Sequence, residues 1–230
     1  MSEKDSSGPF DRFELAAAIL LGLGAVGASV AGYQSGLWGG ASVEGYGESA
    51  AMTTKASTTY NDELTSYIHD AQVDVRAKEM IWEALEIDDE ARVTRLKEMA
   101  SWLYISQLSD PAYAALKLPK VDETSEELVA FEDKALEEAL NTDLGEDYVD
   151  ALFTDSAAEF EAAEARFLKA RNANEYGDQF SLAGVILTVA LFFGGLALVF
   201  KTKIRWGFLA TGVTVLLVGS AFMSTLTWAG

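Results

Sequence analysis

Two short stretches of the sequence hold residue types that could perform chemistry. The first is Gly22-Leu23-Gly24-Ala25-Val26-Gly27, which matches the glycine pattern that holds a pyrophosphate in dinucleotide-binding proteins. Glu44 follows at about the distance of the acidic residue that binds the ribose in such proteins. The second stretch surrounds His69, the only histidine, which stands beside Asp70 and close to Asp74. An imidazole near carboxylates could hold a metal ion or act as a base.

Helix packing explains the glycine pattern better than nucleotide binding does. A dinucleotide fingerprint joins a strand to a helix, but these glycines lie in the uncharged stretch 15–43, and no alternation of strands and helices follows. Small residues recur there at every fourth position, which predicts a stripe through which membrane helices approach closely. We predict that this helix-packing interface consists of Gly24, Ala28, Gly32, Gly36 and Gly40.

The surroundings of His69 do not complete a known catalytic or metal site. A single histidine cannot supply the two Glu-x-x-His elements of a di-iron bundle, and a catalytic triad has no convincing partners here. The chain has no cysteine, which excludes disulfides, thiolate nucleophiles and cysteine metal sites. We predict no catalytic, cofactor-binding or metal-binding residues and a solvent-facing His69. An enzyme or sensor built around His69 is the alternative.

Charge and apolar residues are segregated along the chain. Half of the 230 residues are hydrophobic, yet the net charge is −19, and almost all charge lies between residues 44 and 178. Three uncharged apolar runs are each long enough to cross about 30 Å of hydrocarbon as a helix. We predict an all-α membrane protein with a leader (1–14), three transmembrane helices (15–40, 179–200 and 206–228), an acidic helical extramembrane domain (41–178) and a basic loop (201–205).

The charges also limit the partners and the orientation. A strongly acidic chain lacks the basic face that binds nucleic acid, so we expect no nucleic acid as a partner. The expected partners are the lipid bilayer and other copies of the chain, with another membrane subunit as a further candidate. No ionisable residue lies well inside a span, which argues against an ion-coupled transporter. Lys201, Lys203 and Arg205 make the short loop positive, and such loops stay in the cytoplasm. The prediction is a multi-pass cell-membrane protein with a cytoplasmic N-terminus and the helical domain outside.

The helices on either side of the acidic domain are predicted to continue as a helical-hairpin stalk. Apolar and small residues alternate there in steps of four and three, which is typical of helix–helix seams. If the helices run antiparallel, Phe167 lies near Ala50, Phe160 near Ser57 and Phe153 near Leu64. Pairing between subunits is the alternative. The stalk seam includes Tyr60, Leu64, Phe153, Phe160 and Phe167.

Short distal helices are predicted at 88–109, 111–118 and 123–141. Asp110-Pro111 reads as a helix cap, Pro119 as a helix end, and Thr124-Ser125-Glu126-Glu127 as a capping box. Asp143-Leu144-Gly145 predicts a turn. The apolar stretch containing Trp102, Tyr104 and Ile105 must be buried, either in the distal core or against a partner.

The stretch Tyr33-Gln34-Ser35-Gly36-Leu37-Trp38-Gly39-Gly40 resembles a group of uncharacterised bacterial membrane proteins. The resemblance lies in the Tyr-Gln and Trp-Gly neighbourhood. It implies one N-terminal span, a helical insert and two C-terminal spans, and it implies no activity and no catalytic residues.

Two functions fit these features. The first is a non-enzymatic oligomeric membrane protein that acts as a scaffold or accessory subunit through its extramembrane helical domain. The alternative is a homo-oligomeric, cation-favouring pore lined by Thr188, Thr211 and Thr214.

Overall fold

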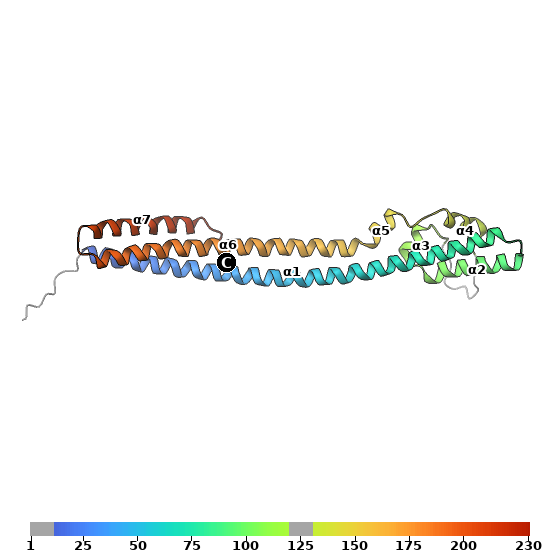
Figure 1. Cartoon of the computed structure of the whole chain (residues 1–230), viewed down its shortest axis with the longest axis horizontal. Coiled ribbons are helices and arrows are strands. Elements are labelled where there is room, and N and C mark those ends of the chain that lie inside the picture. The colour runs from blue at the N-terminus through green and yellow to red at the C-terminus, as the bar shows by residue number, and fades with distance from the viewer. Residues whose placement is uncertain (1–11, 120–130) are drawn as a thin grey trace, which may run out of the picture. The chain divides into compact units, whose positions relative to one another are not determined.

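The computed structural model describes residues 12–119 and 131–230, and all regular secondary structure in these ranges is helical (Figure 1). The all-α prediction is therefore confirmed. Most of the predicted leader and the predicted capping box at 124–127 lie outside the described residues. The helices are α1 (Arg12–Glu86), α2 (Glu90–Gln107), α3 (Asp110–Ala115), α4 (Asp133–Leu140), α5 (Glu146–Leu152), α6 (Thr154–Val199) and α7 (Ile204–Ser224).

Packing divides the chain into two compact units. Unit 1 consists of Met1–Ser49 and Glu164–Gly230, and unit 2 consists of Ala50–Ala163. The helices α1 and α6 are each continuous through both units. The predicted continuation of both flanking membrane helices beyond their apolar stretches is thus present in the backbone.

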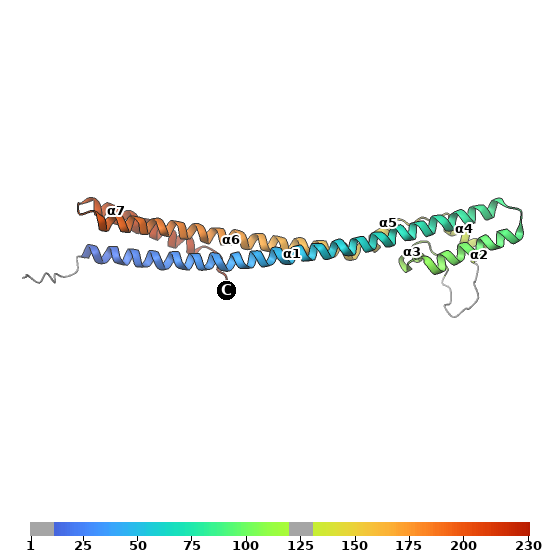
Figure 2. The ribbon, with the colours of Figure 1, turned by 60° about the horizontal axis from the view of Figure 1, so that its bottom comes forward.

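Unit 1 contains the apolar parts of α1, α6 and α7. All three helices are long and apolar enough to cross a membrane, which confirms the membrane-protein prediction. In two views the N-terminal part of α1 runs beside the C-terminal part of α6, and α7 returns along α6 (Figures 1 and 2). The helix α7 begins at Ile204 and ends at Ser224, so the loop is shorter than 201–205 and the last helix ends before Trp228.

Glycines allow these three helices to approach one another closely. A Cβ atom added at Gly24 would lie 2.6 Å from a methyl carbon of Leu191, and one at Gly212 would lie 2.8 Å from Leu20 and 3.2 Å from the carbonyl oxygen of Ala190. A Cβ at Gly219 would meet Leu187 at 3.0 Å. Dispersion between closely packed surfaces has to hold membrane helices together, since lipid removes most of the hydrophobic driving force.

Unit 2 has an apolar core that α1 shares with α2, α3 and α4. Asp89 caps α2 by accepting bonds from the backbone nitrogens of Ala91 and Arg92. The helix α3 is capped by Ser109 instead of the predicted Asp110, because the Ser109 hydroxyl accepts from the nitrogen of Ala112 while Asp110 is already helical. The predicted turn at 143–145 separates α4 from α5. The core includes Val73, Ala77, Ile81, Leu103, Tyr104, Leu116, Phe131 and Leu136.

Replacing Gly212 by Val should destabilise unit 1 by about 2 kcal/mol, because the added carbons overpack a site bounded partly by backbone. The measurement is the midpoint of heat-induced loss of helicity for the full chain in mild detergent. Gly207→Val is the matched control, since a Cβ at Gly207 meets nothing within 4 Å. Equal midpoints for the two variants would contradict this account of the packing.

Candidate functional site

The side of α1 that packs in unit 1 differs from the predicted glycine stripe. Buried residues along this part of α1 are Ala17, Leu20, Gly24, Ala31 and Gln34, which lie three, four or seven positions apart. This 3.5-residue period keeps one face of α1 toward its neighbours.

The predicted stripe repeats every fourth residue, and each repeat turns about 40° past a full helical turn. Between Gly24 and Gly40 the stripe therefore rotates by about 160°. Gly24 packs against Leu191, and the carbonyl oxygen of Ala28 lies 3.9 Å from a Cβ added at Gly184. Gly32, Gly36 and Gly40 are exposed, and a Cβ added at any of them meets nothing within 4 Å. These three residues form the open glycine row, and the stripe is not a single contact surface within one copy.

The stretch 33–40 joins α1 to the segment after α7. Gln34 is buried, and its amide pairs with the backbone of Ala229: its oxygen accepts from the nitrogen at 2.9 Å, and its nitrogen donates to the carbonyl oxygen at 3.4 Å. The indole of Trp38 donates to the carbonyl oxygen of Thr227 at 2.9 Å. The backbone groups of Thr227 and Ala229 lie beyond the end of α7 and have no helical hydrogen bonds. Gln34 and Trp38 supply hydrogen-bond partners for them.

The same stretch also contacts α6. The Trp38 ring lies 5.0 Å from the Tyr176 ring, and the hydroxyls of Ser35 and Ser181 are hydrogen-bonded at 2.7 Å. Aromatic and polar groups gathered at one end of apolar helices are typical of a membrane interface. This end of the bundle is thus held by specific contacts as well as by glycine packing.

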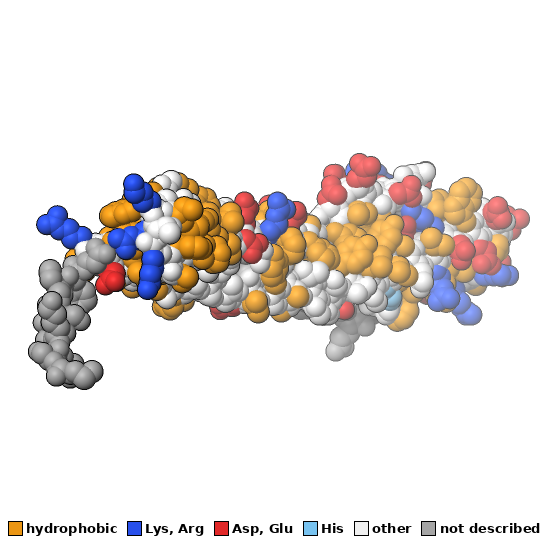
Figure 3. Space-filling view, turned by 60° about the vertical axis from the view of Figure 1, so that its left-hand side comes forward, with side chains coloured by type: hydrophobic (Ala, Val, Ile, Leu, Met, Phe, Trp, Pro, Cys, Tyr) orange, Lys and Arg blue, Asp and Glu red, His pale blue; other side chains and the backbone are white. Residues whose placement is uncertain are grey.

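The opposite end of the apolar bundle is basic. Arg205 lies over the Phe13 ring at 4.2 Å, and the Phe13 and Trp206 rings meet at 5.0 Å. Arg12, Lys201 and Lys203 are exposed around this contact. Figure 3 shows the resulting group of Lys and Arg side chains at the end of unit 1.

The predicted stalk seam is shifted on α1. In unit 2 the buried residues Ala56 and Asp70 lie one position before Ser57 and Ala71, which the steps of four and three place on the seam. Ala50, the first residue of unit 2, is exposed, whereas Gly45 and Ser49 in unit 1 are buried. Small side chains therefore fill the contact face of α1. On α6 the predicted positions Ser156, Ala163, Ala170 and Gly177 are buried.

The aromatic residues predicted to fill the seam lie along its edge, one helical turn from the expected register. The Phe167 ring meets Tyr46 at 5.4 Å instead of Ala50, and the Phe153 ring meets Tyr60 at 5.2 Å instead of Leu64. Phe160 is exposed and Leu64 is half-buried. Rings of this size do not fit between helices that approach at Gly45, where a Cβ would lie 2.8 Å from that of Ala170.

Buried carboxylates organise the interior of unit 2. Asp70 is 1% exposed and accepts three bonds: from the backbone nitrogen of Ser109 at 2.9 Å, from its hydroxyl at 2.5 Å and from the Tyr148 hydroxyl at 2.6 Å. Asp74 accepts from the Tyr104 hydroxyl at 3.0 Å and pairs with Lys78 at 2.8 Å. A buried charge requires such partners, because desolvation is otherwise costly.

The proton states of these groups follow from burial and charge. Burial, together with the hydrogen bond to Asp70, raises the pKa of Tyr148. Burial and the Asp74 carboxylate raise the pKa of Tyr104 in the same way. Burial would lower the pKa of the Lys78 ammonium, but hydrogen bonds to Asp74 and Asp143 outweigh it and raise that pKa. Both tyrosines keep their protons and donate to the carboxylates, and Lys78 keeps its charge.

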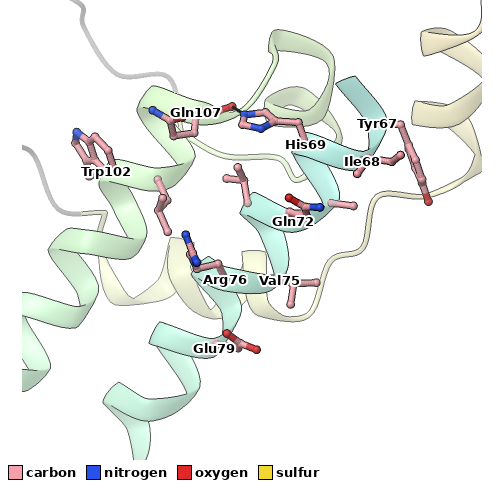
Figure 4. Close-up of a pocket in the computed structure, with 12 residues that line it drawn as sticks. Tyr67, Ile68, His69, Gln72, Val75, Arg76, Glu79, Trp102 and Gln107 are labelled. Carbon is pink, nitrogen blue, oxygen red and sulfur yellow. Dashed lines mark hydrogen bonds between the residues drawn. The ribbon is translucent and has the colours of Figure 1, made fainter. Parts of the chain in front are cut away.

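The predicted partner surface divides between the inside and the outside of unit 2. Tyr104 is fully buried, so it belongs to the core and is not available to a partner. Trp102 and Ile105 are exposed. Trp102 lies on the wall of a groove of about 810 Å³ between α1 and α2, whose other wall includes Ile68, Val75 and Arg76 (Figure 4).

His69 lies on the rim of this groove and is exposed. Its Nε2 lies 2.9 Å from the carbonyl oxygen of Gln107, to which it donates near the end of α2. Within residues 12–119 and 131–230, no group of three or more His, Cys, Asp or Glu side chains could hold a metal ion.

The threonines predicted to line a pore are all exposed on α6 and α7. The hydroxyl of Thr188 donates to the carbonyl oxygen of Gly184, and that of Thr214 donates to Ala210. These hydroxyl protons are bound within their own helices.

Comparisons with protein-family models, curated proteins and solved structures found no match to this chain.

Three features of the structure escaped the sequence analysis. The pairing of Gln34 with Ala229 had one signal, a lone amide within an uncharged span. The buried pair Asp70 and Asp74 lies four residues apart on one face of a helix, which is a weak signal among so many acidic residues. The exposed residues Ile68, Val75 and Trp82 recur every seventh position, a pattern that could have been found.

Replacing Asp70 by Ala should open α2 and α3, because the Ser109 and Tyr148 donors would lose their buried acceptor. The expected local cost is about 3 kcal/mol, equivalent to about a hundredfold faster amide hydrogen exchange in α2 and α3. The exposed residue Asp62 provides the control variant Asp62→Ala, which should leave exchange unchanged. Unaltered protection in Asp70→Ala would show that the network does not hold these helices.

Proposed function

We propose that the protein is a non-enzymatic, homo-oligomeric integral membrane protein that acts as a scaffold or accessory subunit through its extramembrane helical domain. The observation that carries this proposal is the open glycine row. Gly32, Gly36 and Gly40 are exposed in an apolar helix and have nothing within 4 Å of an added Cβ. A helix of a second copy could approach such a surface as closely as Leu191 approaches Gly24.

The basic end of unit 1 supports an orientation. Arg12, Lys201, Lys203 and Arg205 lie at the same end of the apolar bundle, and positive charge next to spans favours the cytoplasmic side. We place this end in the cytoplasm of the cell and the acidic helical domain outside.

A cation-favouring pore is the second candidate. A cation binds to oxygen lone pairs, and the exposed Thr188 and Thr214 hydroxyl oxygens keep theirs while their protons are donated within their own helices. The pore also requires several copies to enclose a lumen, whereas the scaffold requires only contact between copies. The scaffold is therefore the first candidate, and conductance of the purified protein in planar bilayers would reverse that order.

Replacing Gly36 by Leu should weaken self-association without disturbing the fold of one copy, because Gly36 is exposed and a Cβ added there meets nothing within 4 Å. We expect the association constant to fall by about tenfold, equivalent to about 1.4 kcal/mol. The measurement is energy transfer between donor- and acceptor-labelled full chains in liposomes, with dyes on a cysteine introduced at Ser66.

The matched control is Gly207→Leu on α7, where the glycine is also exposed and without neighbours within 4 Å. It should associate as the parent protein does. If Gly36→Leu and the control give the same energy transfer, the open glycine row is not a contact surface. If the parent protein shows no transfer at any density, the oligomer itself is wrong.

The orientation predicts opposite reactivity for two introduced cysteines. The exposed Ser66→Cys should react with a membrane-impermeant maleimide on intact cells, whereas Lys201→Cys should react only after the membrane is opened. The chain has no native cysteine to interfere. The reverse pattern would place the helical domain in the cytoplasm.

A further inference from the structure

One face of α1 in unit 2 is exposed and carries apolar side chains that no lipid covers in the proposed arrangement. Ile68, Val75 and Trp82 are 47%, 56% and 58% exposed and recur every seventh residue. This spacing places them along one edge of the helix. Thr65, Gln72 and Glu79 follow beside them, also exposed and also seven residues apart. These six residues form the open face of unit 2.

The open face also forms one wall of the groove between α1 and α2, since Ile68, Gln72, Val75 and Glu79 line that groove. Arg76 lies beside the open face and lines the same groove, and Trp102 of α2 stands on the opposite wall at 45% exposure (Figure 4). A polar protein surface seldom leaves an apolar edge and an apolar groove side by side without a partner.

The charges on and beside the open face are self-complementary. Arg76 and Glu79 lie about one turn apart on α1, and in Figure 4 their charged ends point away from each other. Neither has an ion-pair partner within residues 12–119 and 131–230. In a two-fold pair each surface meets its own copy, so Arg76 of each copy can meet Glu79 of the other.

We propose that the open face of unit 2 binds the same face of a second copy, with the two α1 helices parallel. A two-fold axis along the helices brings the Ile68–Val75–Trp82 edge of one copy against the side of the open face that carries Arg76 in the other. Gln72 then lies opposite Gln72 of the second copy. This inference rests on the proposed self-association and adds a second contact, in the extramembrane domain.

The parallel direction follows from the membrane. All copies of one chain enter the bilayer with the same orientation, so their α1 helices run in the same direction. Confinement to a membrane also raises the effective concentration of the second copy, so a modest surface can still pair.

Cysteine cross-linking of the full chain in native membranes tests the proposal, since the parent has no cysteine. The central residues of the face should lie near their counterparts, so Thr65→Cys and Gln72→Cys should form disulfide-linked dimers under mild oxidation. Ser66→Cys is the matched control. Like Thr65, it is exposed and its hydroxyl bonds only to its own helix, but it points about 100° away from the open face.

The expected result is a dimer yield for the two face variants several times that of Ser66→Cys, about fivefold or more. Yields no higher than that of Ser66→Cys would overturn the proposal. Dimers at Thr65→Cys and Gln72→Cys that persist when Gly36→Leu is added would support the proposal and separate it from the contact in the span. Energy transfer that depends on Gly36, without cross-linking at residues 65 and 72, would leave the proposed function standing and remove this inference.

A charge exchange in the Gln72→Cys protein provides a second measurement. Arg76→Glu should lower the dimer yield by about fivefold through like-charge repulsion with Glu79 of the other copy. Adding Glu79→Arg should restore the yield, because the pair is re-formed with reversed charges. A double variant no better than Arg76→Glu would show that these side chains do not meet across the interface.

Discussion

The structure of unit 1 depends on how closely the backbones of α1, α6 and α7 can approach. At Gly24, Gly45, Gly212 and Gly219 even one added carbon would lie 2.6–3.0 Å from a side chain of a neighbouring helix. In lipid this approach has to supply most of the attraction between helices. It can do so only along a face that keeps its direction, and the buried residues of α1 meet that condition with steps of three, four or seven. Dispersion alone would allow the packed segments to slide past one another. The hydrogen bond between Gln34 and Ala229 fixes their position, because it forms in one register only.

Specific hydrogen bonds fix the packing of the helices in unit 2. Its core contains two carboxylates, and each is met by hydroxyl, amide or ammonium donors from other elements. Breaking one such contact leaves a buried charge without a partner, whereas sliding an apolar side chain costs little. Asp70 thereby ties α1 to the cap of α3 and to α5, and Asp74 ties it to α2. The acidic composition of the chain is thus more than a solvated surface.

The sequence was sufficient for the helical class, the three apolar spans and the approximate ends of α2, because long uncharged runs and capping residues act locally. It was not sufficient to predict which face of α1 packs against the other helices. A repeat of four and a repeat of three-and-four fit the same short stretch, and only the partner helix distinguishes them. Tyr60 and Phe153 were expected to fill the seam, but they lie at its edge because Gly45, Ala56, Ala163 and Ala170 set a spacing too small for rings. Tyr104 and Trp102 were grouped together, yet they point to opposite sides of α2, one into the core and one into solvent.

The open glycine row and the open face of unit 2 require explanation because neither benefits a single copy. Glycine in a helix costs about 1 kcal/mol relative to alanine, and next to lipid it gains no contact in return. An exposed tryptophan in water likewise loses the burial that large aromatic side chains usually obtain. Gly32, Gly36, Gly40 and Trp82 carry these costs on sides of α1 that its neighbours in the same chain leave uncovered. A second copy would offset both costs. In lipid, close contact at the glycines would gain dispersion energy, and outside the membrane, contact at Trp82 would bury its ring. Both contacts would then favour association with a second copy of the chain.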